Sequence, residues 1–392
     1  MNDAVSFGRT IEMLRLRRGM TRETLAELIG RSTEWLRQVE RQDRPVDRLS
    51  VLLRLAEVLH VRDITGFLGL PDAVSRTTSP HQAVESTFLS TLLGHWAGGE
   101  DPRSGAESDW IPLEGRWEEW YGSTKRFSLA LAALPLLLTN TRVIDRRAWP
   151  QGAHEFAETH RFAATVMMRM GDFQLALLAI ERGLAAAQVS RKEATLHACR
   201  LAYGAAVLDS GLPREAGRIF EGIADSISDT GSKSEAALLA WKGAAYLGGA
   251  VAASHDCDAG TMHSLLARAR ECAGGACSPN LFGPAEVDLE EIRIHLMQSK
   301  YKSALKLADH VDFTPEMSRD WRAQFFLMMT QAHLKLGDVV AASFSLLQVE
   351  EVSSEEITFN PQARELAKEL MCRDSSTVRR NLWPLFNRAG LL

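Results

Sequence analysis

The sequence has little of what secreted, membrane-bound or disulfide-stabilised proteins need. Its 392 residues include five cysteines, an odd number scattered along the chain, which argues against a disulfide framework and indicates reduced thiols. No stretch approaches the roughly 20 apolar residues that span a bilayer, and the longest candidate, residues 129–138, is interrupted by Pro135. The first residues lack the basic-then-apolar order of a secretory signal. We therefore expect a cytoplasmic protein without a membrane partner.

Motifs of catalysis and cofactor binding are also missing. The sequence has no glycine-rich phosphate loop, no Gly-x-Ser-x-Gly elbow and no His-Glu-x-x-His pair, so we expect neither an enzyme nor a cofactor. Metal-ligand side chains do gather in one short stretch, at His255, Asp256, Cys257, Asp258 and His263. Their spacing fits no zinc template, and we interpret this stretch as part of a solvated, loop-rich insertion.

Lysine is absent from the first 70 residues, which hold twelve arginines and ten acidic residues. This segment has a net charge of +2, whereas the rest of the chain carries −7, giving −5 overall. This difference in charge is typical of a protein whose N-terminal segment binds nucleic acid and whose remainder is acidic. The alternative is that the difference arises by chance.

Breaker residues divide the chain into three zones. Residues 1–68 have helical periodicity. Residues 69–110 contain Pro71, Pro80 and a Gly-Gly-Glu-Asp-Pro run, which predict a linker with one helix over residues 81–96. Residues 111–392 have the pattern of successive helices, and no convincing run of strands occurs anywhere, so we predict an all-α protein.

The first zone has the spacing of a helix-turn-helix. We predict a helix over residues 6–17, a second capped by Thr21, a turn at Gly30 and a third helix over residues 33–41 capped by Ser32. A fourth helix over residues 47–60 closes the domain. The alternative is a four-helix domain that only packs or dimerises.

The segment from Thr21 to Glu40 resembles the XRE, or lambda-repressor-like, family of DNA-binding domains. The resemblance covers about the first 65 residues and rests on Leu25, Ala26, Gly30, Ser32, Leu36, Val39 and Glu40. It implies that the helix from Thr33 lies in the major groove and that the start of the preceding helix docks on a phosphate. The candidate DNA-binding residues are Arg22, Ser32, Thr33, Glu34, Arg37, Gln38 and Arg41.

Base chemistry suggests roles for three of these residues. Arg37 is suited to guanine, Gln38 to adenine and Glu34 to cytosine. Trp35 is large for a recognition helix, and it either covers the edge of the core or touches a sugar. Because one such unit reads few base pairs, we predict a homodimer on an inverted repeat of double-stranded DNA.

Self-similar turn segments recur after residue 150. Four of them share one frame, starting at Gly171, Gly211, Ser299 and Gly337 and ending at Ala176, Ala216, Ala304 and Ala342. The long middle interval has room for one further unit, which makes about five helix pairs. The pattern resembles the tetratricopeptide repeat from about His154 to Glu350, and the resemblance implies an α-solenoid with a concave groove.

The repeat frame indicates which side chains line this groove. The candidate ligand-binding residues are Arg161, Thr165, Arg169, Leu201, Arg293, Gln324, Leu327 and Gln331. An apolar floor with scattered polar groups suits a peptide or an amphipathic small molecule, although the scarcity of asparagine weighs against a peptide. The alternative is that the groove packs against the N-terminal domain or a second subunit.

Together the two parts resemble bacterial regulators in which a signal bound by the repeats changes the spacing of the DNA-binding heads. We therefore predict a transcription regulator with a helix-turn-helix domain at residues 1–68, a linker at 69–110 and a sensing and dimerisation domain at 111–392. The alternative function is an adaptor that recruits a protein partner to DNA without sensing a ligand.

Overall fold

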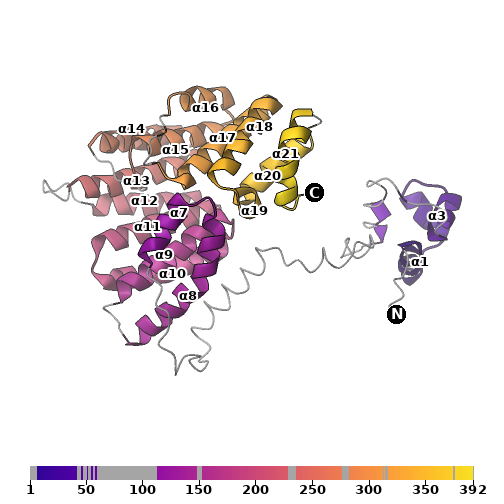
Figure 1. Ribbon diagram of the computed structural model, residues 1–392, viewed down its shortest axis with the longest axis horizontal. Helices are drawn as coiled ribbons and strands as arrows, with labels where there is room; N and C mark the ends of the chain where they lie inside the picture. The colour runs from indigo at the N-terminus through magenta and orange to yellow at the C-terminus, as the bar shows by residue number, and fades with distance from the viewer. Residues whose placement is uncertain are drawn as a thin grey trace. The chain divides into compact units, whose positions relative to one another are not determined.

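Helices make up every regular element that the structure describes. The computed structural model describes residues 7–41, 113–147, 152–227, 235–275, 282–311, 317–373 and 376–391, with the single positions 46, 51, 54, 55, 58, 59 and 313. No strand occurs in these ranges (Figure 1), so the all-α prediction is confirmed. The chain forms two compact units, residues 1–83 and 84–392. The predicted linker helix over residues 81–96 lies outside the described residues.

The N-terminal unit contains α1 (Phe7–Arg17), α2 (Arg22–Leu28) and α3 (Thr33–Glu40). The hydroxyl of Thr21 accepts a hydrogen bond from the backbone N–H of Thr24 at 3.1 Å and so caps α2, as the sequence predicts. Gly30, with a φ of +67°, makes the turn before α3. Most of the predicted fourth helix lies outside the described residues. Its described apolar positions join the domain core, which consists of Ile11, Leu25, Ala26, Ile29, Leu36, Val39, Val51, Leu55 and Leu59.

Among the described residues, the C-terminal unit contains an array of five helix pairs, in agreement with the prediction of about five (Figure 1). A preceding pair and three following helices flank it. The five pairs are α9 (Ala153–Arg169) with α10 (Phe173–Ser190), α11 (Glu193–Asp209) with α12 (Pro213–Ser226), α13 (Glu235–His255) with α14 (Ala259–Gly275), α15 (Pro284–Met297) with α16 (Tyr301–Ala308), and α17 (Arg319–Leu336) with α18 (Val339–Val352). The flanking helices are α7 (Glu114–Gly122), α8 (Arg126–Arg147), α19 (Glu356–Phe359), α20 (Pro361–Met371) and α21 (Ser376–Arg388).

One turn geometry joins the two helices of every pair. In the last pair Gly337 has a φ of +81°, and its N–H donates to the carbonyl of Leu334 at 3.1 Å. The N–H of Asp338 then donates to the carbonyl of His333 at 2.9 Å. These paired bonds satisfy carbonyls that the end of the first helix leaves free. The same two bonds and a positive φ recur at Gly171, Gly211, Cys257 and Ser299.

The turn between α13 and α14 contains Cys257, so the expectation of a loop-rich insertion there is wrong. His255 ends α13, and α14 begins at Ala259. Asp258 caps α14, because its Oδ1 accepts from the N–H of Thr261 at 3.1 Å. The metal-ligand types in this stretch therefore belong to a tight repeat turn and to the two helices that it joins. The sequence frame does not reveal this turn, because Cys257 replaces the usual glycine and Met262 replaces the usual alanine.

Helix α13 contains a longer apolar segment than residues 129–138, which the sequence analysis took as the longest. Its segment from Ala236 to His255 is long and apolar enough to cross a membrane, with a mean hydropathy of 1.3. Half of the segment is buried within the protein, where α13 packs against α12 and α14. Its composition is therefore that of a core helix.

The two ends of the helix array contact each other. The side chain of Arg319, at the start of α17, donates to the carbonyl of Gly122 at the end of α7 at 2.8 Å. The ring of Phe127 on α8 stacks on Phe359 of α19, with centroids 5.3 Å apart. These contacts join residues about 200 positions apart in the sequence, so the array is closed on itself.

A largely buried group of charged and polar residues, which we call the closure cluster, lies at this junction. It consists of Arg126, Arg169, Asp320, Glu356 and Asn360. Arg126 donates to Asp320 at 2.6 Å and to Glu356 at 2.9 Å, and its guanidinium lies 4.8 Å from the ring centre of Trp120. Arg169 donates twice to Asp320, at 3.0 and 2.8 Å. Asn360 donates to the other oxygen of Glu356 at 2.9 Å. The two cations and two anions balance within the cluster.

The closure cluster makes the helix array sensitive to loss of a single charge. We expect Arg126→Met to lower the free energy of unfolding by about 3 kcal/mol or more, because Glu356 then stays buried without a cationic partner and Asp320 keeps only Arg169. Urea denaturation of full-length protein measures this effect. The exposed Lys368–Glu365 pair serves as the control, since we expect Lys368→Met to change stability by no more than about 0.5 kcal/mol. Equal effects of the two substitutions would contradict the structural role of the cluster.

The shared turn geometry makes a second prediction. We expect Ser299→Gly to stabilise the protein by up to about 1 kcal/mol, because its φ of +57° is unfavourable for a residue with a Cβ. Gly337→Ala should have the opposite effect, of about 1–2 kcal/mol, because Gly337 has a φ of +81°. Urea denaturation of both variants checks the signs. If Ser299→Gly destabilises the protein, the turn assignment is wrong.

Candidate DNA-binding surface and ligand pocket

Helix α3 carries the predicted DNA-binding residues on its exposed side. The hydroxyl of Ser32 accepts from the N–H of Trp35 at 3.1 Å and caps the helix. Leu36 and Val39 pack into the domain core. This register leaves Thr33, Glu34 and the capping residue Arg41 exposed, and Arg37 and Gln38 partly exposed.

The three candidate base-reading residues contact one another. Glu34 accepts hydrogen bonds from Arg37 at 2.7 and 2.5 Å and from Gln38 at 3.3 Å. The hydrogen bond from Arg37 holds the pKa of Glu34 below its ordinary value. Contacts of Arg37 or Gln38 with a base edge would therefore replace contacts that Glu34 already makes.

Arg22 lies at the first position of α2, where the sequence places a phosphate contact, and it is held there by two carboxylates. Its Nη2 lies 3.1 Å from an oxygen of Glu12, and its Nε donates to Glu40. Glu40 is buried and also accepts from Arg15 at 2.7 Å. Glu40 thus fixes α1, α2 and the end of α3 together. Sequence reasoning noted Glu40 as a family hallmark but did not assign it this role.

Trp35 covers the edge of the core, as one of the two alternatives from the sequence expects, and contact with a sugar stays a prediction. Its half-buried ring packs against the core of the N-terminal unit. The guanidinium of Arg31 lies 5.6 Å from the ring centre, a cation–π distance. Arg31 thereby shields an aromatic surface beside the turn.

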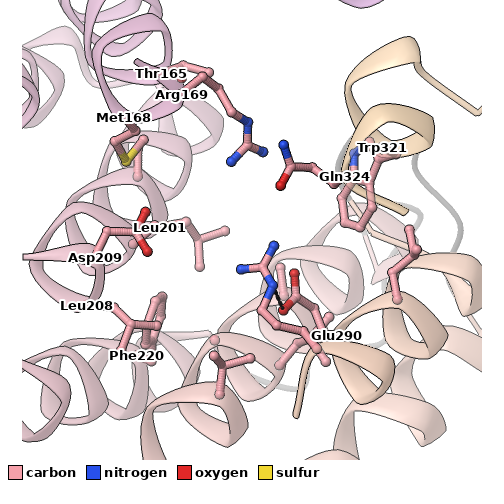
Figure 2. A pocket seen from close by; sticks show the side chains of 18 of the residues that line it. Thr165, Met168, Arg169, Leu201, Leu208, Asp209, Phe220, Glu290, Trp321 and Gln324 are labelled. Carbon is pink, nitrogen blue, oxygen red and sulfur yellow. Dashed lines mark ion pairs between the residues drawn. The ribbon is translucent and has the colours of Figure 1, made fainter. Parts of the chain in front are cut away.

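A pocket of about 320 Å³, which we call the central pocket, lies inside the closed helix array. The first helices of all five pairs contribute to its wall, and Phe220 of α12 adds to its floor. Phe220 fits between α11 and α13 because Gly204 and Gly248 lack side chains there. A Cβ at either glycine would lie within 2.7 Å of its ring. Figure 2 shows side chains from both sides pointing into the pocket.

The structure brings six of the eight predicted ligand-binding residues to this one pocket: Arg161, Thr165, Arg169, Leu201, Arg293 and Gln324. The other two lie elsewhere on α17. Leu327 is fully buried in the core that α17 forms with α18, α20 and α21. Gln331 lines a separate surface hollow beside α20. A role in ligand binding stays a prediction for each of the eight.

The repeat frame could have identified further lining residues. Arg169 lies two residues before the turn glycine of its pair, and Asp209 holds the same position in the next pair. Both line the central pocket, but sequence reasoning named only Arg169. It also missed the lining residues of α13, because the turn at Cys257 that would align them has neither the glycine nor the alanine of the frame. Those residues are Trp241, Ala244, Leu247, Gly248 and Val251.

The arginines of the central pocket already have carboxylate partners. Arg161 lies 2.6 Å from Glu158, Arg169 lies 2.8 Å from Asp320, and Arg293 lies 3.2 Å from Glu290. Asp209, by contrast, has no ion-pair or hydrogen-bond partner among the described residues. Burial raises the pKa of Asp209, although Arg293 and Arg169 favour its charged form.

Comparisons with known proteins agree with the N-terminal geometry. Residues 6–64 match a family model described as a helix-turn-helix domain. The N-terminal unit therefore contains a helix-turn-helix DNA-binding domain of the XRE-like class. This domain supports a DNA-binding regulator.

The whole-chain comparisons are weaker. No curated protein matches the chain. A crystal structure of Bacillus thuringiensis PlcR, in complex with the peptide PapR7 and DNA, is similar over 78% of this chain and 95% of its own, with 12% identity and a TM-score of 0.33. A likeness of this degree carries no argument about the present chain.

The contacts of Glu34 lead to a prediction for DNA binding. We expect Glu34→Gln to bind random-sequence duplex several-fold more tightly at moderate salt, because it removes a negative charge and weakens the hold on Arg37. Fluorescence anisotropy with labelled duplex measures the change. Glu118→Gln, an exposed site on α7, makes the same charge change and should leave affinity unaltered. Weaker binding by Glu34→Gln would contradict this placement of Glu34 at the DNA surface.

Proposed function

We propose that the protein is a cytoplasmic transcription regulator whose operator affinity depends on a small molecule bound in the central pocket. The observation that carries the proposal is the presence, in one chain, of a helix-turn-helix domain and a closed helix array around a pocket with polar groups. A helix array that served only as a scaffold would not require such a pocket.

Sequence-specific DNA binding is supported by the exposed side of α3. Its arginine, glutamine and glutamate are the side-chain types that distinguish base pairs in the major groove. Because one α3 helix spans few base pairs, we propose that the protein binds an inverted repeat as a homodimer.

Coupling between pocket and fold is supported by the position of Arg169. This residue lines the central pocket and also donates to Asp320 in the closure cluster. A ligand that contacts Arg169 therefore acts on a residue that joins the two ends of the array. In the mechanism that we propose, the ligand favours one curvature of the array over another and so shifts the population of DNA-binding states.

One observation favours a protein partner for the C-terminal unit. Val340 and Phe344 on α18 expose 59% and 68% of their surface, although both are apolar. The same surface suits either dimerisation or the alternative function, a DNA-anchored adaptor. The mass of the complex on an inverted-repeat duplex separates the two, because dimerisation predicts two chains per duplex without any other protein.

A variant with a filled pocket tests the sensing proposal. We expect the small-molecule fraction of native host cells to change the operator affinity of the wild-type protein by about fivefold or more. Ala244→Trp, which fills the central pocket, should abolish this response while DNA binding persists. Ala132→Trp, on an exposed position of α8, is the matched control and should respond like the wild type. A response that survives in Ala244→Trp would place the sensor elsewhere.

A further inference from the structure

The charges of the central pocket indicate what kind of ligand it takes. Five charged side chains line the pocket, three of them arginines, and this composition at first suggests an acidic ligand. Each arginine, however, has a carboxylate within ion-pair distance, from Glu158, Asp320 and Glu290 respectively. The remaining charge is the unpaired carboxylate of Asp209.

In the folded protein without a ligand, the charged carboxylate of Asp209 lies in an unfavourable position. It is the last residue of α11, where the carbonyl end of the helix repels a negative charge. Asp209 is exposed within the pocket, and the surrounding protein atoms raise its pKa, although Arg293, Arg169 and His255 favour its charged form. A carboxylate without an ion-pair partner at a helix C-terminus is less favourable than a paired one, and a bound cation would offset both disadvantages.

The rest of the wall limits the size and shape of the ligand. Leu201, Trp241 and Leu289 present apolar surface from three successive helix pairs. The contacts between α7–α8 and α17–α19 close the array, and the volume of about 320 Å³ is near the lower end of small-molecule pockets. Figure 2 shows the carboxylate of Asp209 pointing into this space. The pocket is partly open to solvent, and its volume limits the part of a ligand that it encloses to the size of a small molecule.

We propose that the central pocket takes a small organic amine, whose ammonium group pairs with Asp209 and whose apolar body packs against Leu201, Trp241 and Leu289. This inference rests on the proposed function and adds to it the chemical class of the signal. An acidic ligand would instead raise the negative charge of a pocket whose arginines are already neutralised.

Matched probes test the proposal directly on the full chain without DNA. Isothermal titration calorimetry near neutral pH compares an amine, an alcohol and a carboxylate on each of three bodies. The sets are 2-phenylethylamine, 2-phenylethanol and 3-phenylpropionate; tryptamine, tryptophol and indole-3-propionate; and hexylamine, hexanol and heptanoate. We expect at least one amine to bind about tenfold or more tightly than its alcohol, the difference that a charge-assisted hydrogen bond makes. Its carboxylate should bind most weakly.

Variants assign this preference to Asp209. We expect Asp209→Asn to reduce the amine-to-alcohol ratio to about one, while alcohol affinity stays unchanged. Its Tm without ligand should equal or exceed that of the wild type, because the substitution removes an unfavourable charge. Asp225→Asn, on an exposed position of α12, should keep the full amine preference.

Several outcomes would overturn the proposal: no amine preference in any of the three sets, tightest binding by a carboxylate, or an amine preference that persists in Asp209→Asn. Because these measurements contain no DNA, they are independent of the sensing proposal. Amine binding at Asp209 without any change in operator affinity would refute sensing and leave this inference intact.

Discussion

The buried pairing of Arg126 and Arg169 with Asp320 and Glu356 is the constraint on which the C-terminal unit depends. A stack of helix pairs can in principle continue indefinitely with an open groove. Here the cluster joins α8 and α9 to α17 and α19, so that the first and last pairs meet. The pKa of Asp320 is held well below its usual range by the two arginines. Asp320 therefore stabilises the fold above its unfolded-state pKa, and this contribution is lost only as the pH falls toward the lowered pKa of the folded state.

Closure changes what the inner surface of the array can bind. In an open solenoid the first helices line a long groove that suits an extended chain. In this protein the same helix positions, seen at Arg161, Arg169, Leu201 and Asp209, surround a cavity of limited volume. The selectivity of that cavity then depends on which of its charged groups remain without a partner. Internal ion pairing, rather than the number of arginines, determines the sign of charge that a ligand must bring.

Much of the fold follows from local patterns in the sequence. Caps at Thr21 and Ser32 and a left-handed glycine at each typical turn identify helices and pairs, because these positions have strict backbone requirements. The third pair shows the limit of this reasoning, since Cys257 adopts the same left-handed conformation without glycine and without the alanine that identifies the turn at Ser299. The closure cluster was not predictable from sequence, because its partners are brought together only by the accumulated curvature of the whole array.

The two candidate sites differ in the same way: one follows from local sequence patterns and the other depends on the assembled helix array. The exposed side of α3 follows from one helix and its cap, so the candidates that the sequence places on this helix do lie on its exposed side, while Arg22 lies on α2. The central pocket depends on the rotation of each pair against the next, and a constant repeat frame holds for α9, α11, α13 and α15. It fails at α17, where Asp320 is drawn into the closure cluster and Gln324, but not Leu327 or Gln331, lines the pocket. The contact that closes the array therefore also determines which face of its last pair a ligand can touch.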